Sequence, residues 1–237
     1  MKCIVVCSGK GGTGKSCVTA YMGAALAGAG SKTLLLEQGA DARSLHLILG
    51  TPAAAYGVSD VMARFCEAGE AIIPVENIPG LYLMPAGETS ATYDERQFSS
   101  LLRDLRDNYD FLLIDGVDLS SFPVAEADMF MLVLTPDTLC VRACAAAARK
   151  LFALGAGEVR LLINNVPPRI IPIDGVKDFD DIIDKTGAQL IGVIPASPKL
   201  SYCANNAKPL DPDSLTIKTF ENLAGRLMGK RRPLLIR

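Results

Sequence analysis

The stretch Gly9-Lys10-Gly11-Gly12-Thr13-Gly14-Lys15-Ser16 decides the fold of this chain. It fits the phosphate-loop pattern G-x-x-x-x-G-K-[ST], between an apolar run expected to be a strand and a segment expected to be a helix through Ala27. Glycines let backbone N–H groups face phosphate oxygens, and the helix N-terminus adds a favourable dipole. We therefore predict a site for ATP and Mg²⁺, in which Lys15 neutralises the β and γ phosphates and Ser16 Oγ ligates the metal.

The same stretch also satisfies a second pattern. Gly9, Gly11 and Gly14 fit the dinucleotide-binding pattern G-x-G-x-x-G, and an acidic residue, Glu37, ends the next expected strand. A dinucleotide-binding turn has no need for Lys-Ser directly after its third glycine, whereas a site for triphosphate and Mg²⁺ needs both. The pattern favours the phosphate loop and leaves a nicotinamide-dependent oxidoreductase as an alternative.

Short apolar runs alternate with segments of helical period along the chain, and several runs are apolar throughout, which is typical of a parallel sheet covered on both faces. The sequence predicts an α/β fold with a doubly wound, mostly parallel sheet and helices on both faces, whose ligand site lies beyond the carboxyl ends of the strands. The expected strands are Lys2–Cys7, Thr33–Leu36, Leu81–Met84, Phe111–Ile114, Met129–Leu134, Arg160–Ile163 and Leu190–Ile194. Three stripes at helical spacing are expected in the core: Phe98, Leu101, Leu102 and Leu105; Val141, Ala145, Ala148 and Phe152; and Phe220, Leu223, Ala224, Leu227 and Met228.

Composition and charge limit the class of protein. The 237 residues are 49% hydrophobic and 21% charged, with no low-complexity linker, so we expect one domain over 1–229 and a short basic-apolar tail over 230–237. The net charge of -2 and the lack of an internal Lys/Arg run argue against nucleic-acid binding, and Lys230-Arg231-Arg232 is expected to be solvated. The chain shows no signal peptide and no long apolar run. Cys3, Cys7 and Cys17 follow no metal-ligand spacing, and Cys140 and Cys144, which share a face of an expected helix, lack the further ligands that a metal site needs. We expect a cytoplasmic protein.

An acidic residue is expected at the tip of a strand beside such a loop. Asp115 directly follows the apolar run Phe111–Ile114 and can orient a water on Mg²⁺. In isolation, a strand-end Asp can equally cap a turn. Beside the phosphate loop, the metal role is the favoured interpretation.

With Lys10 included, the loop reads Lys-Gly-Gly-Thr-Gly-Lys-Ser, a deviant Walker A sequence, and the chain here resembles the MinD/ParA family of ATPases. The likeness keeps the family's order and spacing to about residue 229 and looks like the MinD and flagellar-placement branch. It continues through Gly57-Val58-Ser59-Asp60-Val61, Gly80-Leu81-Tyr82-Leu83-Met84-Pro85-Ala86-Gly87, Tyr109-Asp110-Phe111-Leu112-Leu113-Ile114-Asp115, Thr135-Pro136-Asp137 and Leu190-Ile191-Gly192-Val193-Ile194-Pro195.

The resemblance implies a homodimer around ATP, in which Lys10 reaches the partner's phosphates, and a role in positioning a division, flagellar or pilus apparatus. It also implies that Asn164 reads adenine, with Pro195 near the base; an amide suits adenine because it both donates and accepts hydrogen bonds. Asn164-Asn165 could instead simply begin a loop. The nucleotide-binding residues implied by the resemblance are Gly11, Gly12, Thr13, Gly14, Lys15, Ser16, Cys17, Asn164 and Pro195.

Two segments depart from the family pattern. Where this branch has Asp-x-Asp, the chain reads Glu37-Gln38-Gly39-Ala40-Asp41, so Gly39 replaces the expected catalytic carboxylate and Asp41 is the candidate substitute. The loop after Asp115 also differs, reading Gly116-Val117-Asp118. Two hypotheses follow: a slow ATPase whose catalytic residues are Lys10, Lys15 and Asp41, or an ATP-binding scaffold that recruits a partner protein without turnover.

The branch typically ends in an amphipathic membrane helix. This chain ends in a short segment containing Pro233, which argues against a stable interfacial helix. We expect membrane contact that is at most transient.

Overall fold

The computed structural model describes residues 1–38, 44–87, 94–117, 119, 122–168, 176–208, 210–211 and 214–235. Its centre is an eight-stranded sheet of order β3-β4-β2-β5-β1-β6-β7-β8. Every neighbouring pair is parallel except β3 and β4, which confirms the predicted doubly wound, mostly parallel sheet. The strands are β1 (Lys2–Cys7), β2 (Thr33–Glu37), β3 (Ile73–Pro74), β4 (Leu81–Met84), β5 (Phe111–Asp115), β6 (Met129–Leu134), β7 (Val159–Val166) and β8 (Gln189–Pro195).

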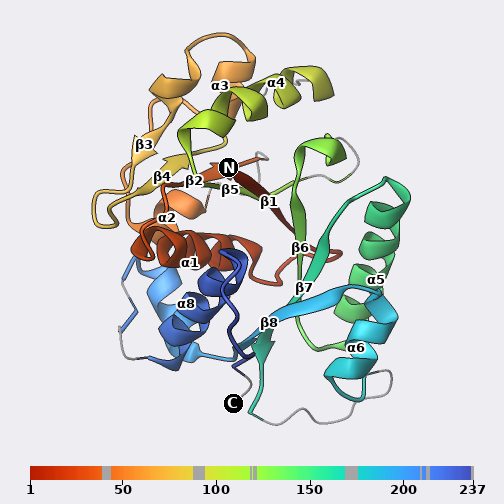
Figure 1. Cartoon of the computed structure of the whole chain (residues 1–237). Coiled ribbons are helices and arrows are strands. Elements are labelled where there is room, and N and C mark those ends of the chain that lie inside the picture. The colour runs from red at the N-terminus through yellow and green to blue at the C-terminus, as the bar shows by residue number, and fades with distance from the viewer. Residues whose placement is uncertain are drawn as a thin grey trace.

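Helices cover both faces of this sheet (Figure 1). Alternate residues of β1 point to opposite faces, so Cys3 and Val5 pack in one hydrophobic cluster and Ile4 and Val6 in the other. The first cluster contains residues of α4 (Glu95–Leu105), α5 (Thr138–Ala153) and α6 (Phe179–Thr186). The second contains residues of α1 (Lys15–Gly28), α2 (Leu45–Leu49), α7 (Pro198–Asn205) and α8 (Leu215–Leu227).

The elements that the sequence pattern missed are short. They are β3, α2, α3 (Val58–Met62), α6, α7 and three 3₁₀ turns, η1 (Ala68–Ala71), η2 (Arg106–Asn108) and η3 (Val124–Glu126). Elements of eight residues or fewer span too few periods for a hydrophobic repeat to identify them. The seven strands that were predicted are all present.

The predicted helix stripes are buried, with two differences. The stripe of α4 lies in the core, and so does that of α8 except Met228, which is only partly buried. In α5, Phe152 is 46% exposed, contrary to the prediction, whereas Leu151 is buried. The buried residues of α5 are Cys140, Val141, Cys144, Ala145, Ala148 and Leu151, so in the last turn Leu151 and not Phe152 takes the core position.

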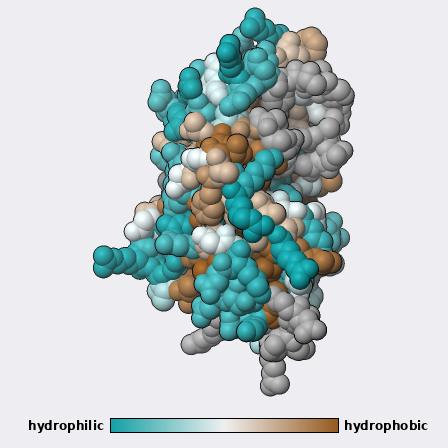
Figure 2. Space-filling model, turned by 90° about the vertical axis from the view of Figure 1, so that its right-hand side faces the viewer, coloured by the Kyte–Doolittle hydropathy of each residue, from teal (hydrophilic) through white to brown (hydrophobic). Residues whose placement is uncertain are grey.

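The face seen in Figure 2, the right-hand side of Figure 1, is largely hydrophilic, with hydrophobic side chains in patches. Leu139 and Phe152 of α5 are among the large hydrophobic side chains of the molecule that are exposed. Within the described ranges, no helix is long and apolar enough to cross a membrane.

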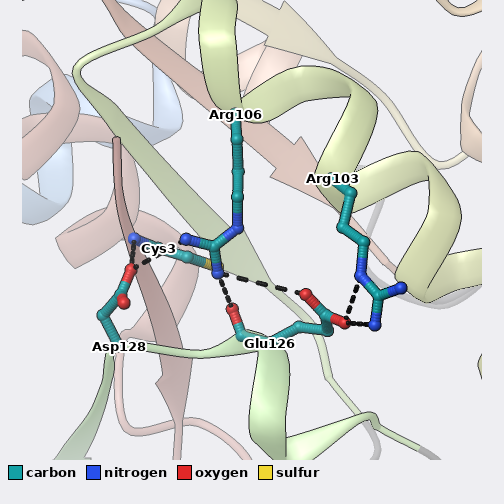
Figure 3. A network of polar contacts seen from close by, with 5 residues as sticks. All are labelled: Cys3, Arg103, Arg106, Glu126 and Asp128. Carbon is teal, nitrogen blue, oxygen red and sulfur yellow. Dashed lines mark hydrogen bonds and ion pairs between the residues drawn. The ribbon is translucent and has the colours of Figure 1, made fainter.

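A polar network ties α4 to the start of the central strands (Figure 3). Arg103 Nε donates to Glu126 Oε1 at 2.9 Å, and Arg106 Nη2 donates to the carbonyl oxygen of Glu126 at 2.9 Å. Asp128 Oδ2 accepts from the Cys3 N–H at 2.7 Å and lies 3.7 Å from Arg106 Nη1. The network fixes the end of the segment that runs from Asp115 to β6.

The C-terminal segment folds back on α8. The Lys230 N–H donates to Gly225 O at 2.9 Å, and Asn222 Nδ2 donates to Pro233 O at 3.1 Å. Residues 229–233 are exposed, as expected of a solvated basic end. Its main chain is held in place by these hydrogen bonds, so the segment is solvated but rests against α8.

Candidate nucleotide-binding site

The predicted phosphate loop joins β1, in the middle of the sheet, to α1 at the edge formed by the carboxyl ends of the strands. Gly12 and Gly14 have φ angles of 77° and 88°, a left-handed conformation that glycine adopts without steric cost. Gly14 is the N-cap of α1, and no side chain caps this helix. The first N–H groups of α1 are therefore available to an anion.

Helix α5 and strand β7 hold the loop in shape. A Cβ at Gly9 would lie 2.2 Å from the Ala143 carbonyl carbon, so only glycine permits this close approach. The Gly9 N–H donates to Cys144 Sγ at 3.4 Å, and Asn164 Nδ2 donates to Thr13 O at 2.8 Å. The loop is thus shaped before any ligand arrives.

Two buried carboxylates lie beside the start of α1. Glu37 and Asp115 end the neighbouring strands β2 and β5, are in register, and are both fully buried. Thr19 Oγ1 donates to Asp115 Oδ1 at 3.4 Å. Asp115 Oδ2 and Glu37 Oε2 have no hydrogen-bond donor among the described residues. Buried carboxylate oxygens without donors, close to the Ser16 hydroxyl, fit a hydrated Mg²⁺.

The pKa of Asp115 reflects this position. Burial raises it above the usual value, and the nearby Glu37 carboxylate raises it further. Hydrogen bonds from Ser16 and Thr19 and the charge of Lys15 oppose the shift without cancelling it. A cation next to Asp115 would favour the charged form and reverse the effect of burial.

Glu37 has a second function in the fold. Its Oε1 accepts from the Ser44 N–H at 2.7 Å and from the Leu45 N–H at 3.2 Å, at the start of α2. It thereby holds the chain that follows residues 39–43. The proposed substitute carboxylate, Asp41, and the glycine at 39 lie outside the described residues.

Lys10 lies in contact with its own chain. Its Nζ is 3.9 Å from Asp137 Oδ1, and both side chains are about half exposed (48% and 44%). Asp137 also caps α5 by accepting from the Cys140 N–H at 2.9 Å. Burial alone would raise the pKa of Asp137, but hydrogen bonds from Thr135 and Cys140 and the charge of Lys10 hold it below its usual value.

The other predicted residues lie around the same edge. Lys15 is the first residue of α1, and Cys17 is half-buried, with burial raising its thiol pKa to about 12. Pro195 ends β8, three strands away from β1, which is about 14 Å at the usual strand spacing. The described residues contain no cluster of three His, Cys, Asp or Glu side chains arranged to hold a metal ion. Mg²⁺ commonly needs only one or two protein ligands beside phosphates and waters.

The sequence pattern did not single out Cys144 or Asp137 as contacts of the loop, although Asp137 was part of a quoted motif, nor Thr19 as a donor to Asp115. Their nearness depends on how α5 packs beside the loop and how α1 packs on β5. A spacing within one segment carries no information about such contacts.

Comparisons with known proteins agree with this geometry. A family model described as the CobQ/CobB/MinD/ParA nucleotide binding domain matches residues 4–210. The septum site-determining protein MinD of Synechocystis is 33% identical over 242 residues, which cover 98% of this chain and 91% of that protein. The likeness therefore extends over nearly the whole chain.

Solved structures, among them the following two, are also similar to this chain. The MinC:MinD cell division protein complex of Aquifex aeolicus contains a chain that superposes with a TM-score of 0.90 at 28% identity, covering 100% of this chain and 99% of that one. The septum site-determining protein MinD of Pyrococcus horikoshii, solved in complex with Mg-ADP, superposes with a TM-score of 0.82 at 24% identity over 95% of each chain. At that identity the second likeness shows the fold alone.

Proposed function

Because this chain belongs to the CobQ/CobB/MinD/ParA nucleotide-binding domain family, we propose that it is a MinD-like ATP-dependent switch that dimerises around ATP and hydrolyses it slowly. The observation that carries the proposal is the preformed loop Gly9–Ser16 facing the buried carboxylate of Asp115, whose Oδ2 lacks a donor among the described residues. Family membership also sets aside the dinucleotide-binding alternative.

The proposal assigns a role to each residue around the loop. Gly11–Gly14 and the N–H groups of Lys15, Ser16 and Cys17 hold the phosphates, and Lys15 neutralises their charge. Ser16 ligates Mg²⁺ and Asp115 orients a water on it; when bound, the metal neutralises charge on the phosphates. Asn164 donates its amide nitrogen to Thr13 O, so its amide oxygen is the atom that can accept from the adenine amino group. Pro195 lies toward the base.

The dimer gives Lys10 its role. Lys10 is paired with its own Asp137, and it must leave this pair to reach the phosphates of a second copy. A half-exposed ion pair at 3.9 Å contributes less than about 1 kcal/mol, so a bound triphosphate can compete for the lysine. The pair therefore acts as a resting position for Lys10.

The relatives named above determine septum sites, which supports a role in positioning a division apparatus, with a flagellar or pilus apparatus as the other candidates. We propose residues 1–229 as one P-loop ATPase domain, followed by the short tail. All seven cysteines are unpaired, which supports a cytoplasmic location. The partner protein is unidentified; membrane contact is at most transient, and no nucleic-acid partner is expected.

Light scattering tests the switch. The wild-type chain is expected to double its mass with Mg²⁺ and a slowly hydrolysed ATP analogue but not with ADP. Lys10→Ala is expected to bind the analogue and remain monomeric, while Lys150→Ala, an exposed lysine of α5, dimerises normally. A wild-type chain that stays monomeric with saturating ATP analogue would overturn the proposed dimer.

The glycine at position 39 favours a second candidate, an ATP-bound scaffold without turnover, because the family's catalytic carboxylate is missing there. Measurement of phosphate release from ATP distinguishes the slow ATPase from the scaffold. Turnover that needs Lys15 and disappears in Asp41→Ala would reject the scaffold and identify Asp41 as the substitute. Tight ATP binding without phosphate release would instead reject the slow ATPase.

A further inference from the structure

A second cavity lies at the opposite edge of the sheet from the phosphate loop. It has a volume of about 590 Å³ and lies among the amino-terminal ends of β1, β6, β7 and β8 and the segment that follows α8. Figure 1 shows that segment leaving α8 and running toward β8. A strand of six residues spans about 20 Å, so this cavity is well separated from the nucleotide site.

The lining of this cavity, here called the basic cavity, is strongly cationic. Among the described residues that line it, Glu158 is the single carboxylate, in a chain whose net charge is -2. The six cationic side chains come from positions far apart in the sequence: Lys2, Arg160, Arg226, Lys230, Arg231 and Arg232. Such a concentration of one charge in a recess attracts multivalent anions.

The carboxylate neutralises only part of this charge. Glu158 Oε1 accepts from Arg160 Nε at 2.6 Å, and Glu158 Oε2 lies 3.9 Å from Lys2 Nζ. The remaining four cations form no ion pair with any residue that the structure describes. These four are Arg226, Lys230, Arg231 and Arg232.

Arg226 offers a hydrogen-bond donor without a partner. Its Nη1 donates to Arg232 O at 2.6 Å, but its Nε is buried and has no acceptor among the described residues. A buried charged donor left unpaired is costly, and an anion within the cavity would satisfy it. The planar guanidinium groups of the arginines match the oxygens of a phosphate.

The basic cavity is built into the fold. A Cβ at Gly225 would lie 2.5 Å from Arg232 Nε, so glycine lets the Arg232 side chain cross α8 closely. Arg232 Nη1 donates to Glu221 O at 3.4 Å, and the segment is held by the hydrogen bonds from the Lys230 N–H to Gly225 O and from Asn222 Nδ2 to Pro233 O. The side chains of Arg226 and Arg232 are therefore placed before a ligand binds.

We propose that the basic cavity is a second ligand site, which binds a multivalent phosphate anion independently of the nucleotide. The phosphate group is the chemistry that the site recognises. It can come from a soluble phosphorylated compound or from the headgroup of an anionic lipid.

Calorimetric titration of pyrophosphate into the full chain carrying Lys15→Ala, which weakens binding at the phosphate loop, tests the proposal. This reference chain is expected to bind pyrophosphate, and adding Arg226→Gln/Lys230→Gln is expected to weaken binding at least about tenfold, as fits the loss of charged hydrogen bonds. Adding Arg149→Gln/Lys150→Gln instead removes the same charge from exposed positions of α5 and is expected to leave binding as in the reference chain. If the Arg226 variant does not fold, Lys230→Gln/Arg231→Gln, which changes two exposed side chains, takes its place in the titration.

Sedimentation with phosphatidylglycerol or phosphatidylcholine vesicles distinguishes a soluble phosphorylated ligand from the headgroup of an anionic lipid. Pyrophosphate binding alone identifies a soluble ligand. Binding to phosphatidylglycerol vesicles alone, lost in the cavity variants but not in the α5 control, identifies a lipid headgroup. If neither probe binds, or the cavity variants and the control lose binding equally, the proposal is overturned.

Discussion

At the scale of single residues, Gly9 and Gly11 are not equivalent, although both belong to the same loop. A Cβ at Gly9 would collide with the backbone of α5 at 2.2 Å, whereas a Cβ at Gly11 meets no atom within 4 Å. We expect Gly9→Ala to lower the free energy of unfolding of the ligand-free protein by about 1–3 kcal/mol. Gly11→Ala is the control and should change it little; urea unfolding measures both. Equal effects would contradict the tight docking of the loop on α5.

Asp115 gives a second prediction at this scale, because burial raises its pKa in the folded state. Below the pKa of the unfolded state, the Asp115 carboxyl is protonated in both the folded and the unfolded protein. As pH rises through the higher pKa of the folded state, the buried carboxyl must ionise, and the stability contributed by the protonated form is lost. We expect Asp115→Asn to raise the free energy of unfolding of the metal-free protein at pH 7. The gain should vanish below about pH 4, where an unfolded Asp is also protonated.

Urea unfolding at several pH values, with EDTA present, measures this effect. The same variant is expected to lose the stabilisation that Mg²⁺ adds to bound ATP. An Asp115→Asn protein that is less stable than wild type at pH 7 would contradict this prediction, because it would show that interactions within the metal-free protein already stabilise the buried carboxylate.

At the scale of elements, β7 touches the phosphate loop through one side chain. Asn164 Nδ2 donates to Thr13 O, and replacement by Asp would set a carboxylate oxygen against that carbonyl. We expect Asn164→Asp to weaken Mg·ATP binding about tenfold or more, since repulsion adds to the lost hydrogen bond. Asn164→Ala should weaken it less.

Calorimetry with ATP and GTP measures both variants. If Asn164 also reads adenine, Asn164→Ala is expected to narrow the preference for ATP over GTP. A preference unchanged in both variants would limit Asn164 to supporting the loop.

At the scale of the whole molecule, the ion pair between Lys10 and Asp137 opposes dimerisation if Lys10 acts on a second copy. Asp137→Asn removes the charge but keeps an N-cap residue of similar strength for α5. We expect the ATP-dependent dimer to form up to about thirtyfold more tightly, because each of the two copies gives up a pair worth less than about 1 kcal/mol.

Sedimentation equilibrium measures this constant, and Asp137→Asn/Lys10→Ala should remain monomeric. A folded Asp137→Asn protein with weaker dimerisation would indicate that Asp137 itself contacts the second copy.

The two edges of the sheet give the molecule two candidate sites. The carboxyl edge carries the phosphate loop and the buried acidic pair, while the amino edge carries the basic cavity. The same central strand, β1, begins beside one site and ends at the other. Ligand binding at the two edges can therefore be measured separately.

The phosphate loop and the fold class could both be predicted from the sequence alone. The residues of a phosphate loop are contiguous, so Gly9–Ser16 identifies them without knowledge of tertiary contacts. Strands buried on both faces are apolar throughout, so the parallel sheet was also predictable. The short elements, such as β3 and α3, escaped because they span too few periods.

The residues that surround the loop, and those that gather at the opposite edge of the sheet, are known only from the folded molecule. Asp137, Cys144 and Asn164 reach the loop from elements more than a hundred residues away. The basic cavity brings Lys2, Arg160 and Arg226 to the run Lys230-Arg231-Arg232, and the sequence indicates the run but not the residues that join it. Local patterns record contacts between neighbours along the chain, whereas these sites depend on how distant elements pack.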